Sequence, residues 1–466
     1  MIKLTPSQHL FVLQFPNWFT GSNTIAILKA SGGRGKTFVL KYALEKQPHF
    51  SFKKKALIMA ETNEAVLVLV QKLGFGYEHI KTVCSAFNLV HGVNATTGDE
   101  ELKQHREPEF EGITLLVIDE ASMLSSARLK MILDLCRAYG IYALLIGDWK
   151  QLPSPEDETS WNSRCDSVAF VEQWYLDNGF QVPVTFTLTE NMRSSTEHEE
   201  FCEKVGKLQE DGVVGFVPDK YMTPFSTLKK YLQTLEGQDA FLNGDAVVLA
   251  YTNKRVAELN QLVRKELFGK ESEDPFLEGD RILFRQPTKC FDRVIKDGNN
   301  YFESLISQKG VTFTTNTKAV VKKVAYKTVC GMTVVELYVH SNHFVKGLQD
   351  GFIYIPLERK EAFDKYCKMR QTAMYTHDTS ARQKAFERCR LFCSMFNVGI
   401  NSFKEDDCRR DTKHGYAMTV HCSQGSSIPD VFVDEKDIAT IKNKWLRLKV
   451  QYVAYSRVGR YLARLI

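Results

Sequence analysis

Two segments of the sequence combine residue types that can hold and cleave a chain of phosphates. The first, ASGGRGKT at 30–37, follows an apolar run and precedes the helical pattern TFVLKYALEK. Glycines let backbone amides turn towards phosphate oxygens, and the start of a helix favours negative charge. Lys36 would reach the β- and γ-phosphates, and Thr37 would ligate Mg²⁺. This P-loop pattern predicts nucleotide contacts from Gly32, Gly33, Arg34, Gly35, Lys36, Thr37 and Phe38.

The second segment, LLVIDEAS at 115–122, ends an apolar strand pattern with two adjacent carboxylates. Asp119 suits a second contact to Mg²⁺, and Glu120 can orient or deprotonate the attacking water. Two carboxylates are costly to place together unless a cation balances them. A glycine-rich loop and a solvated strand end are the structural alternatives, but their joint occurrence favours a site for ATP and Mg²⁺.

Phosphoryl transfer also needs groups that sense and neutralise the γ-phosphate. Gln151 in GDWKQLPSP follows another strand pattern, and Arg193 and Arg457 lie in LTENMRSS and YVAYSRVGR. A fixed guanidinium can stabilise the charge that spreads over the transferred group. A single arginine is more often a surface residue. Gln151, Arg193 and Arg457 therefore indicate contacts with the γ-phosphate only when they are taken together with the other motifs in their order.

The elements that would position these residues alternate between strand and helix patterns. Over the first 195 residues, short apolar runs are separated by helical segments, which predicts a parallel sheet with ligands beyond the carboxyl ends of its strands. The polar segment 88–112 interrupts this alternation, which begins again at 245–260. Residues 279–358 are rich in strand patterns, and 359–395 are helical and highly charged.

Composition bounds the class of protein without deciding it. The chain has 466 residues, of which 44% are hydrophobic and 25% charged, as in ordinary globular proteins. A net charge of +5 indicates a polyanion partner only weakly. The 11 cysteines form no CxxC pair, which favours free thiols in a reducing compartment. Without a signal-peptide pattern or a long apolar run, we expect a cytoplasmic protein that makes no contact with a membrane.

The motifs, in this order, resemble those of superfamily 1 helicases and of their RecD-like branch in particular. LTPSQ at 4–8 matches the family's Q motif, whose glutamine, here Gln8, reads adenine. AMTVHCSQGSS and YVAYSRVGR match the last two motifs and place Gly425 at the same cleft as Arg457. The resemblance covers nearly the whole chain. It implies hydrolytic roles for Lys36, Thr37, Asp119, Glu120, Gln151, Arg193 and Arg457.

The resemblance also implies an α/β fold with two RecA-like P-loop motor domains. The first would comprise 1–87 and 113–195, with a small pin-like hairpin inserted at 88–112. The second would comprise 196–278 and 411–466, interrupted at 279–410 by a β-barrel and a helical arm. The tip of the pin would lie near NATTGD.

A strand of DNA would cross both motor domains. Hydroxyl and amide groups can grip phosphate in weak, renewable contacts. For an isolated Thr or Asn, a helix cap or turn is the usual role. The run KNKWLRLK at 442–449 is either a basic helix on phosphate or a solvated face. By resemblance, the DNA contacts are Thr62, Asn63, Thr82, Ser85, Thr252, Asn253, His421 and Ser423.

These features predict an ATP-dependent DNA helicase that moves on single-stranded DNA, with RecD-like features implying 5′-to-3′ movement. An alternative is a P-loop ATPase that translocates or remodels nucleoprotein without unwinding. A binding module with a vestigial ATPase fits less well, because the catalytic set is complete. Expected partners are single-stranded DNA and duplex junctions, with a single-strand-binding protein or replication and recombination proteins as further candidates. We expect a monomer.

Overall fold

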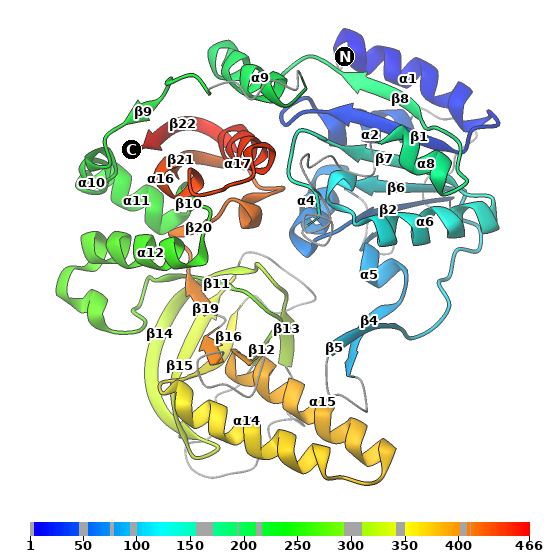
Figure 1. Ribbon diagram of the computed structural model, residues 1–466. Coiled ribbons are helices and arrows are strands. Elements are labelled where there is room, and N and C mark those ends of the chain that lie inside the picture. The colour runs from blue at the N-terminus through cyan, green and yellow to red at the C-terminus, as the bar shows by residue number, and fades with distance from the viewer. Residues whose placement is uncertain are drawn as a thin grey trace.

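The computed structural model shows two parallel sheets flanked by helices, with a curled antiparallel sheet and two long helices below them (Figure 1). It describes residues 4–45, 55–74, 79–93, 100–154, 171–192, 195–210, 217–292, 310–341, 350–400, 408–410 and 412–466. Within these ranges no helix has the length and apolar character needed to cross a bilayer. The predicted α/β fold with two RecA-like motor domains is confirmed.

The first motor domain is built on a six-stranded parallel sheet in the order β3-β2-β6-β7-β1-β8. Because the strands are parallel, all their carboxyl ends lie at one edge. The strands are β1 Ile25–Ala30, β2 Ala56–Ala60, β3 Ile80–Thr82, β6 Leu115–Asp119, β7 Tyr142–Gly147 and β8 Val184–Leu188. The helices are α1 Pro6–Phe19, α2 Lys36–Glu45, α4 Asn63–Leu73, α5 Val83–Ala86, α6 Ser126–Tyr139 and α8 Glu172–Asp177.

Apolar runs in the sequence become buried strands because helices cover both faces of this sheet. Every residue of β2 and β6 is buried, as expected for a parallel sheet packed on two sides. Alternate residues of β1 enter different cores: Ala26 and Leu28 pack into one, Ile25 and Ile27 into the other. Because successive side chains of a strand point to opposite faces, the strand that leads into the P-loop packs against both helical layers.

The second motor domain repeats the plan with a five-stranded parallel sheet in the order β20-β10-β21-β22-β9. Its strands are β9 Met222–Thr223, β10 Ala246–Ala250, β20 Ala417–Thr419, β21 Ile428–Asp434 and β22 Val458–Leu465. Its helices are α9 Thr196–Glu210, α10 Ser226–Leu232, α11 Leu235–Asn243, α12 Asn253–Phe268, α16 Glu435–Ile438 and α17 Lys444–Ser456.

The predicted β-barrel is a curled antiparallel sheet in the order β13-β12-β16-β15-β14-β11-β19. Its strands are β11 Arg281–Phe284, β12 Thr288–Phe291, β13 Gly310–Phe313, β14 Lys318–Val329, β15 Met332–His340, β16 Asp350–Pro356 and β19 Thr412–His414. Because β19 pairs with β11, the chain leaves this sheet only after residue 414, slightly beyond the expected limit of 410. A small pair, β17 Val398–Ile400 and β18 Cys408–Arg410, precedes β19.

The helical arm and the hairpin of the first domain lie next to each other. The arm consists of α14 Arg359–Met374 and α15 Thr379–Phe396, which pack together. The hairpin pairs β4 Leu89–Val93 with β5 Glu100–Gln104, and β4 contacts α15 (Figure 1). The expected hairpin tip, 94–99, lies outside the described residues. Insertions from the two motor domains therefore meet below the cleft.

A buried ionic network joins the second motor domain to the curled sheet. Arg264 on α12 donates from Nε and Nη2 to Asp280, at 3.0 and 2.8 Å, and the Tyr416 hydroxyl donates to the same carboxylate at 3.0 Å. Asp280 is fully buried and Arg264 is 3% exposed. A buried carboxylate is tolerated here because several donors replace its lost hydration.

We predict that Asp280→Ala lowers the free energy of unfolding by about 3–5 kcal/mol, because it leaves Arg264 buried without its carboxylate. Chemical denaturation followed by circular dichroism measures the loss. The control is Glu109→Ala, which breaks a pair with Arg106 whose side chains are 77% and 64% exposed, and we expect it to cost less than about 1 kcal/mol. Equal effects of both substitutions would contradict a structural role for the buried network.

Candidate nucleotide site between the motor domains

The P-loop occupies the turn between β1, which ends at Ala30, and α2, which begins at Lys36. Gly33 and Gly35 have φ values of 84° and 74°, the left-handed region in which a side chain is costly. A Cβ on Gly35 would also lie 2.6 Å from Gln8 Nε2. The glycines are therefore required both for the turn and for close packing behind it.

Gln8 supports the P-loop from behind rather than facing the cavity. Its side chain is fully buried, its Oε1 accepts from Thr5 N, and its Nε2 donates to Arg34 O at 3.2 Å. An adenine contact by Gln8, expected from the Q motif, would need this amide to move. Glu190 accepts hydrogen bonds from Ser7 and Thr5 of the same segment. Burial opposes the ionised form of Glu190, but these hydrogen bonds lower its pKa to about 2.

The acidic pair lies beside the P-loop lysine. Asp119 ends β6 and is 9% exposed, and Glu120 follows it in a left-handed conformation with φ 52°. Lys36 Nζ lies 3.3 Å from Glu120 Oε1. Burial opposes the charge of the lysine, but the carboxylates of Glu120 and Asp119 raise the pKa of Lys36. Burial and the neighbouring Glu120 raise the pKa of Asp119 to about 6.

Asp119 keeps one carboxylate oxygen without a partner at this site. Lys36 lies against Glu120, and Asp119 Oδ1 is buried without a hydrogen-bond partner among the described residues. Buried oxygen atoms normally find a partner. An oxygen ligand left open beside a P-loop threonine fits a hard divalent cation, which prefers carboxylate and hydroxyl oxygens.

The second motor domain completes the wall opposite the P-loop. Arg457, which caps the C-terminus of α17 and is 4% exposed, donates from Nη2 to Gln151 Oε1. The Tyr452 hydroxyl donates to Asp148 at 2.9 Å, and Lys449 Nζ donates to the carbonyl of Gln151 at 3.2 Å. Side chains on α17 therefore bind directly to the loop after β7.

Side chains of both motor domains line one cavity of about 540 Å³. Gln8 does not line the cavity, and Arg193 lies outside the described residues. Sequence reasoning missed Ala65, Val68 and Lys72, although their i, i+3, i+7 spacing on α4 places them on one helix face. Sequence reasoning also missed Met192, which lines the same cavity. The lining residues that the sequence predicted are Gly32, Gly33, Arg34, Gly35, Lys36, Thr37, Phe38, Asp119, Glu120, Gln151, Gly425 and Arg457.

The hydroxyls expected along the DNA strand have local structural roles. Thr62, Thr82 and Thr252 are N-caps of α4, α5 and α12, and each accepts a hydrogen bond from a backbone amide of its own helix. Thr252 Oγ1 also donates to Asp437 at 2.8 Å. Ser423 is fully buried and its hydroxyl donates to Val420 O. The Ser423 hydroxyl is therefore not at the surface, because it bonds within the backbone turn after β20, and a DNA contact by this hydroxyl stays a prediction.

The remaining expected DNA contacts reach the surface. Asn63, Ser85 and Asn253 are exposed, and His421 is half-buried beside the Tyr251 ring, 6.0 Å away. Sequence reasoning missed Arg285 and Lys413, which both donate to Asn253 Oδ1, at 2.6 and 3.1 Å. Their positions in separate curled-sheet segments gave no sequence signal that they meet.

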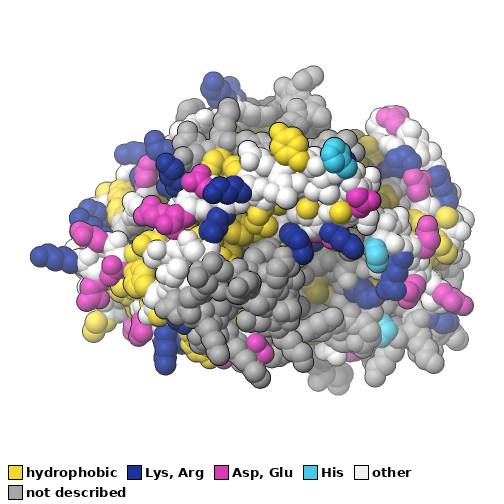
Figure 2. Space-filling view, turned by 90° about the horizontal axis from the view of Figure 1, so that it is seen from below, with side chains coloured by type: hydrophobic (Ala, Val, Ile, Leu, Met, Phe, Trp, Pro, Cys, Tyr) yellow, Lys and Arg dark blue, Asp and Glu magenta, His cyan; other side chains and the backbone are white. Residues whose placement is uncertain are grey.

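Positive charge is otherwise dispersed over the lower face of the molecule. Figure 2, which views the molecule from below, shows Lys and Arg side chains spread over this face and mixed with Asp and Glu. The part of this face that the structure describes therefore has no single broad basic patch. Contacts with phosphate would come from local groups such as the pair beside Asn253.

Comparisons with known proteins agree with this architecture. A family model described as an AAA domain matches residues 4–167. The ATP-dependent DNA helicase Dda of Enterobacteria phage T4 is 26% identical over 274 residues, which make up 56% of this chain and 56% of the phage protein. The chain thus matches just over half the length of that relative. An uncharacterised protein of Acanthamoeba polyphaga mimivirus is 21% identical over 421 residues, 80% of this chain and 78% of that protein.

A similar fold occurs in a solved structure of Pif1 helicases, whose description concerns unwinding of forked double-stranded DNA by two coordinating copies. The match covers 99% of this chain and 92% of the Pif1 chain, with a TM-score of 0.51 and 15% identity. That likeness supports the two-domain fold. The chain is therefore similar in sequence to Dda and in fold to Pif1, both of which are described as helicases.

Proposed function

We propose that the protein is an ATP-dependent DNA helicase that moves 5′-to-3′ on single-stranded DNA. One observation carries the proposal: Lys36, Asp119 and Glu120 of one motor domain and Arg457 of the other line a single cavity. A site split between two bodies can convert nucleotide binding into relative motion, because a ligand that contacts both favours the closed arrangement.

The residues present fit a nucleotide with Mg²⁺. Thr37 and Asp119 would hold the ion, and the open Asp119 Oδ1 is the observation that supports it. When bound, Mg²⁺ would neutralise charge on the phosphate oxygens. Its arrival would also stabilise the ionised form of Asp119, whose pKa is raised to about 6 by burial and Glu120.

The side chains divide the remaining work. Lys36 would bind the β- and γ-phosphates, since it begins α2 directly after the P-loop glycines and lines the cavity. Glu120 would accept a proton from the attacking water or orient that water. Gln151 and Arg457, already in contact, would place an amide and a guanidinium against the γ-phosphate. Arg193 would add a second guanidinium.

DNA would cross the lower edges of both motor domains, above the curled sheet. Asn63 and Ser85 of the first domain, with Asn253 and His421 of the second, present polar groups for phosphate. The Arg285–Lys413 pair adds charge beside Asn253. Cleft closure would shift the two sets of contacts relative to each other, and alternating grip would give net motion. The β4–β5 hairpin would hold the duplex strands apart at the junction.

The function is tested by strand displacement on duplexes with a 5′ tail, a 3′ tail or no tail. We expect ATP to drive displacement from the 5′-tailed duplex, and Lys36→Ala to abolish it. Displacement from 3′-tailed duplexes alone would reverse the polarity. Hydrolysis stimulated by single strands without any displacement would instead identify an ATPase that translocates or remodels nucleoprotein.

A hairpin variant separates the motor from strand separation. Replacing residues 90–103 with a short turn should preserve DNA-stimulated hydrolysis, because the nucleotide cavity is formed by other elements. It should impair displacement, because no structure would then divide the strands. A shortened protein that unwinds like the parent would remove the hairpin from the mechanism.

We predict that Glu120→Gln retains ATP binding but lowers turnover by about 10²–10⁴-fold, because the isosteric amide cannot accept a proton. Nucleotide affinity from a fluorescent analogue and phosphate release at saturating ATP measure the two effects. Weaker binding with unchanged turnover of bound ATP would contradict the role given to Glu120.

We predict that Arg285→Ala with Lys413→Ala weakens single-strand binding and lowers its salt dependence. Each phosphate contact to a single strand contributes about 0.7 to the slope of log K against log salt, so the slope should fall by about 1.4. Binding isotherms at several salt concentrations give this value. The control, Lys229→Ala with Lys230→Ala on α10, removes equal charge from exposed positions and should leave the slope nearly unchanged; equal changes would mean that only net charge matters.

A further inference from the structure

One face of helix α9 lies against two loops of the first motor domain. Glu199, Cys202 and Glu203 line a small cavity together with Arg34 of the P-loop and Lys150 of the loop after β7. On the same stripe of α9, a Cβ on Gly206 would lie 2.7 Å from Lys150 Cδ. The spacing 199, 202, 203, 206 places these residues on one helix face, which is directed at Arg34 and Lys150.

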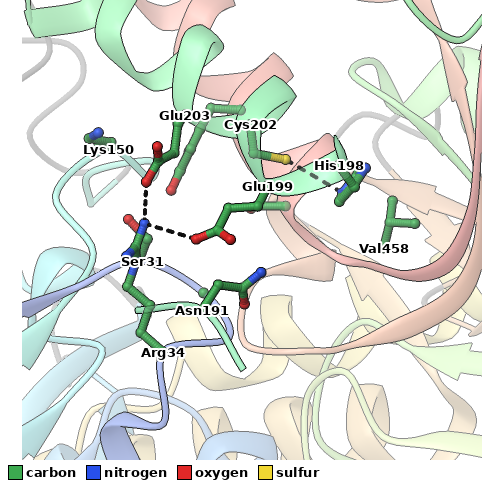
Figure 3. Close-up of a pocket in the computed structure, with 12 residues that line it drawn as sticks. Ser31, Arg34, Lys150, Asn191, His198, Glu199, Cys202, Glu203 and Val458 are labelled. Carbon is green, nitrogen blue, oxygen red and sulfur yellow. Dashed lines mark hydrogen bonds and ion pairs between the residues drawn. The ribbon is translucent and has the colours of Figure 1, made fainter. Parts of the chain in front are cut away.

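Arg34 links this face to the P-loop. Its Nη2 lies 2.5 Å from Glu203 Oε1 and 3.5 Å from Glu199 Oε1, and the residue is only 7% exposed. Figure 3 shows the Arg34 side chain extending from the P-loop to the two carboxylates on the helix above. The guanidinium is buried, whereas the Glu199 and Glu203 side chains are 26% and 44% exposed, so water screens these pairs less than it screens two fully exposed charges.

Helix α9 is packed firmly on the element that carries Arg457. His198 Nε2 lies 3.0 Å from Tyr455 O, and the Phe201 ring lies 5.4 Å from the Tyr455 ring. Phe201 and Val205 share a core with the buried residues of α17. Since Arg457 follows directly on α17, a force on α9 is transmitted through packed side chains to Arg457.

The guanidinium of Arg34 does not serve mainly to attract phosphate. Arg34 lines both the nucleotide cavity and the smaller cavity beside α9, but its side chain binds two carboxylates that together exceed its charge. The group of three therefore has a net charge of −1 and adds no attraction for the anion. Its effect on hydrolysis must come from position.

We propose that Arg34 is a positioning residue that ties the P-loop to α9 and thereby sets the alignment of Arg457 over the nucleotide cavity. The proposal rests on the proposed ATPase function, which it deepens. Arg34 and Arg457 occupy opposite ends of one mechanical path: P-loop, Arg34, the α9 carboxylates, α17, Arg457. Loss of the tie leaves both domains folded and the phosphate cradle intact but lets the two halves of the site drift.

A double-mutant cycle on the ATPase tests this path. We expect Arg34→Gln, and separately Glu199→Gln with Glu203→Gln, to lower kcat by about tenfold while changing the KM for ATP by less than about threefold. The combined variant should be no worse than either parent, because all remove one interaction. Arg34→Lys, which keeps the charge, should recover part of the lost kcat.

Two results of the cycle would overturn the proposal. If Arg34→Gln mainly raises the KM, and the carboxylate substitutions add to that effect, Arg34 binds phosphate directly. If kcat is unchanged in every variant, the ion pairs have no part in alignment. Glu200→Gln is the matched control, since Glu200 is exposed and one residue away from the stripe; it should hydrolyse ATP at the parent rate.

Hydrogen exchange on the nucleotide-free full chain tests the tie independently of catalysis. Glu199→Gln with Glu203→Gln should speed amide exchange in the P-loop peptide 31–36, and Arg34→Gln should speed it in the α9 peptide 199–206. Glu200→Gln should change neither. Unchanged exchange in both peptides would refute the tie even if hydrolysis fell, whereas altered exchange in a protein without ATPase activity would uphold the tie and reject the function.

Discussion

The buried acidic pair is the constraint on which the site depends. Asp119 ends the fully buried strand β6 and Glu120 follows it, and two adjacent carboxylates there need positive charge. Lys36 supplies it at 3.3 Å, which requires the P-loop and the end of β6 to share one sheet edge. The order β6-β7-β1 provides that edge and places the loop after β7 between them. Asp119 Oδ1 is buried without a hydrogen-bond partner among the described residues, which explains why the site suits a cation as well as phosphate.

The second motor domain completes the nucleotide cavity. Lys449 and Tyr452 on α17 bind the loop after β7, and Arg457 at the end of that helix reaches Gln151. Arg34 forms a second connection through α9. Both connections come from helices that pack together in one core.

The curled sheet is joined to the second motor domain at two points. The Asp280–Arg264–Tyr416 network joins the curled sheet to α12, and α12 begins at Asn253, where Arg285 and Lys413 from the curled sheet converge. In the proposed mechanism, this junction between α12 and the curled sheet would pass the closing motion of the motor domains to the DNA strand. The contact between α15 and β4 also joins the hairpin of the first domain to the helical arm.

The sequence by itself determined the fold class and the chemistry of the nucleotide site. Those features are written in local patterns: glycines before Lys36, carboxylates after an apolar strand, and apolar runs that become buried strands. The tertiary structure alone decided which side chains meet over long separations. It placed Gln8 behind the P-loop, used the Ser423 hydroxyl in a turn, made caps of Thr62, Thr82 and Thr252, and brought Arg34 to Glu203. The physical reason is that a motif specifies backbone shape over a few residues, whereas the partner of a long or buried polar side chain depends on how distant segments pack.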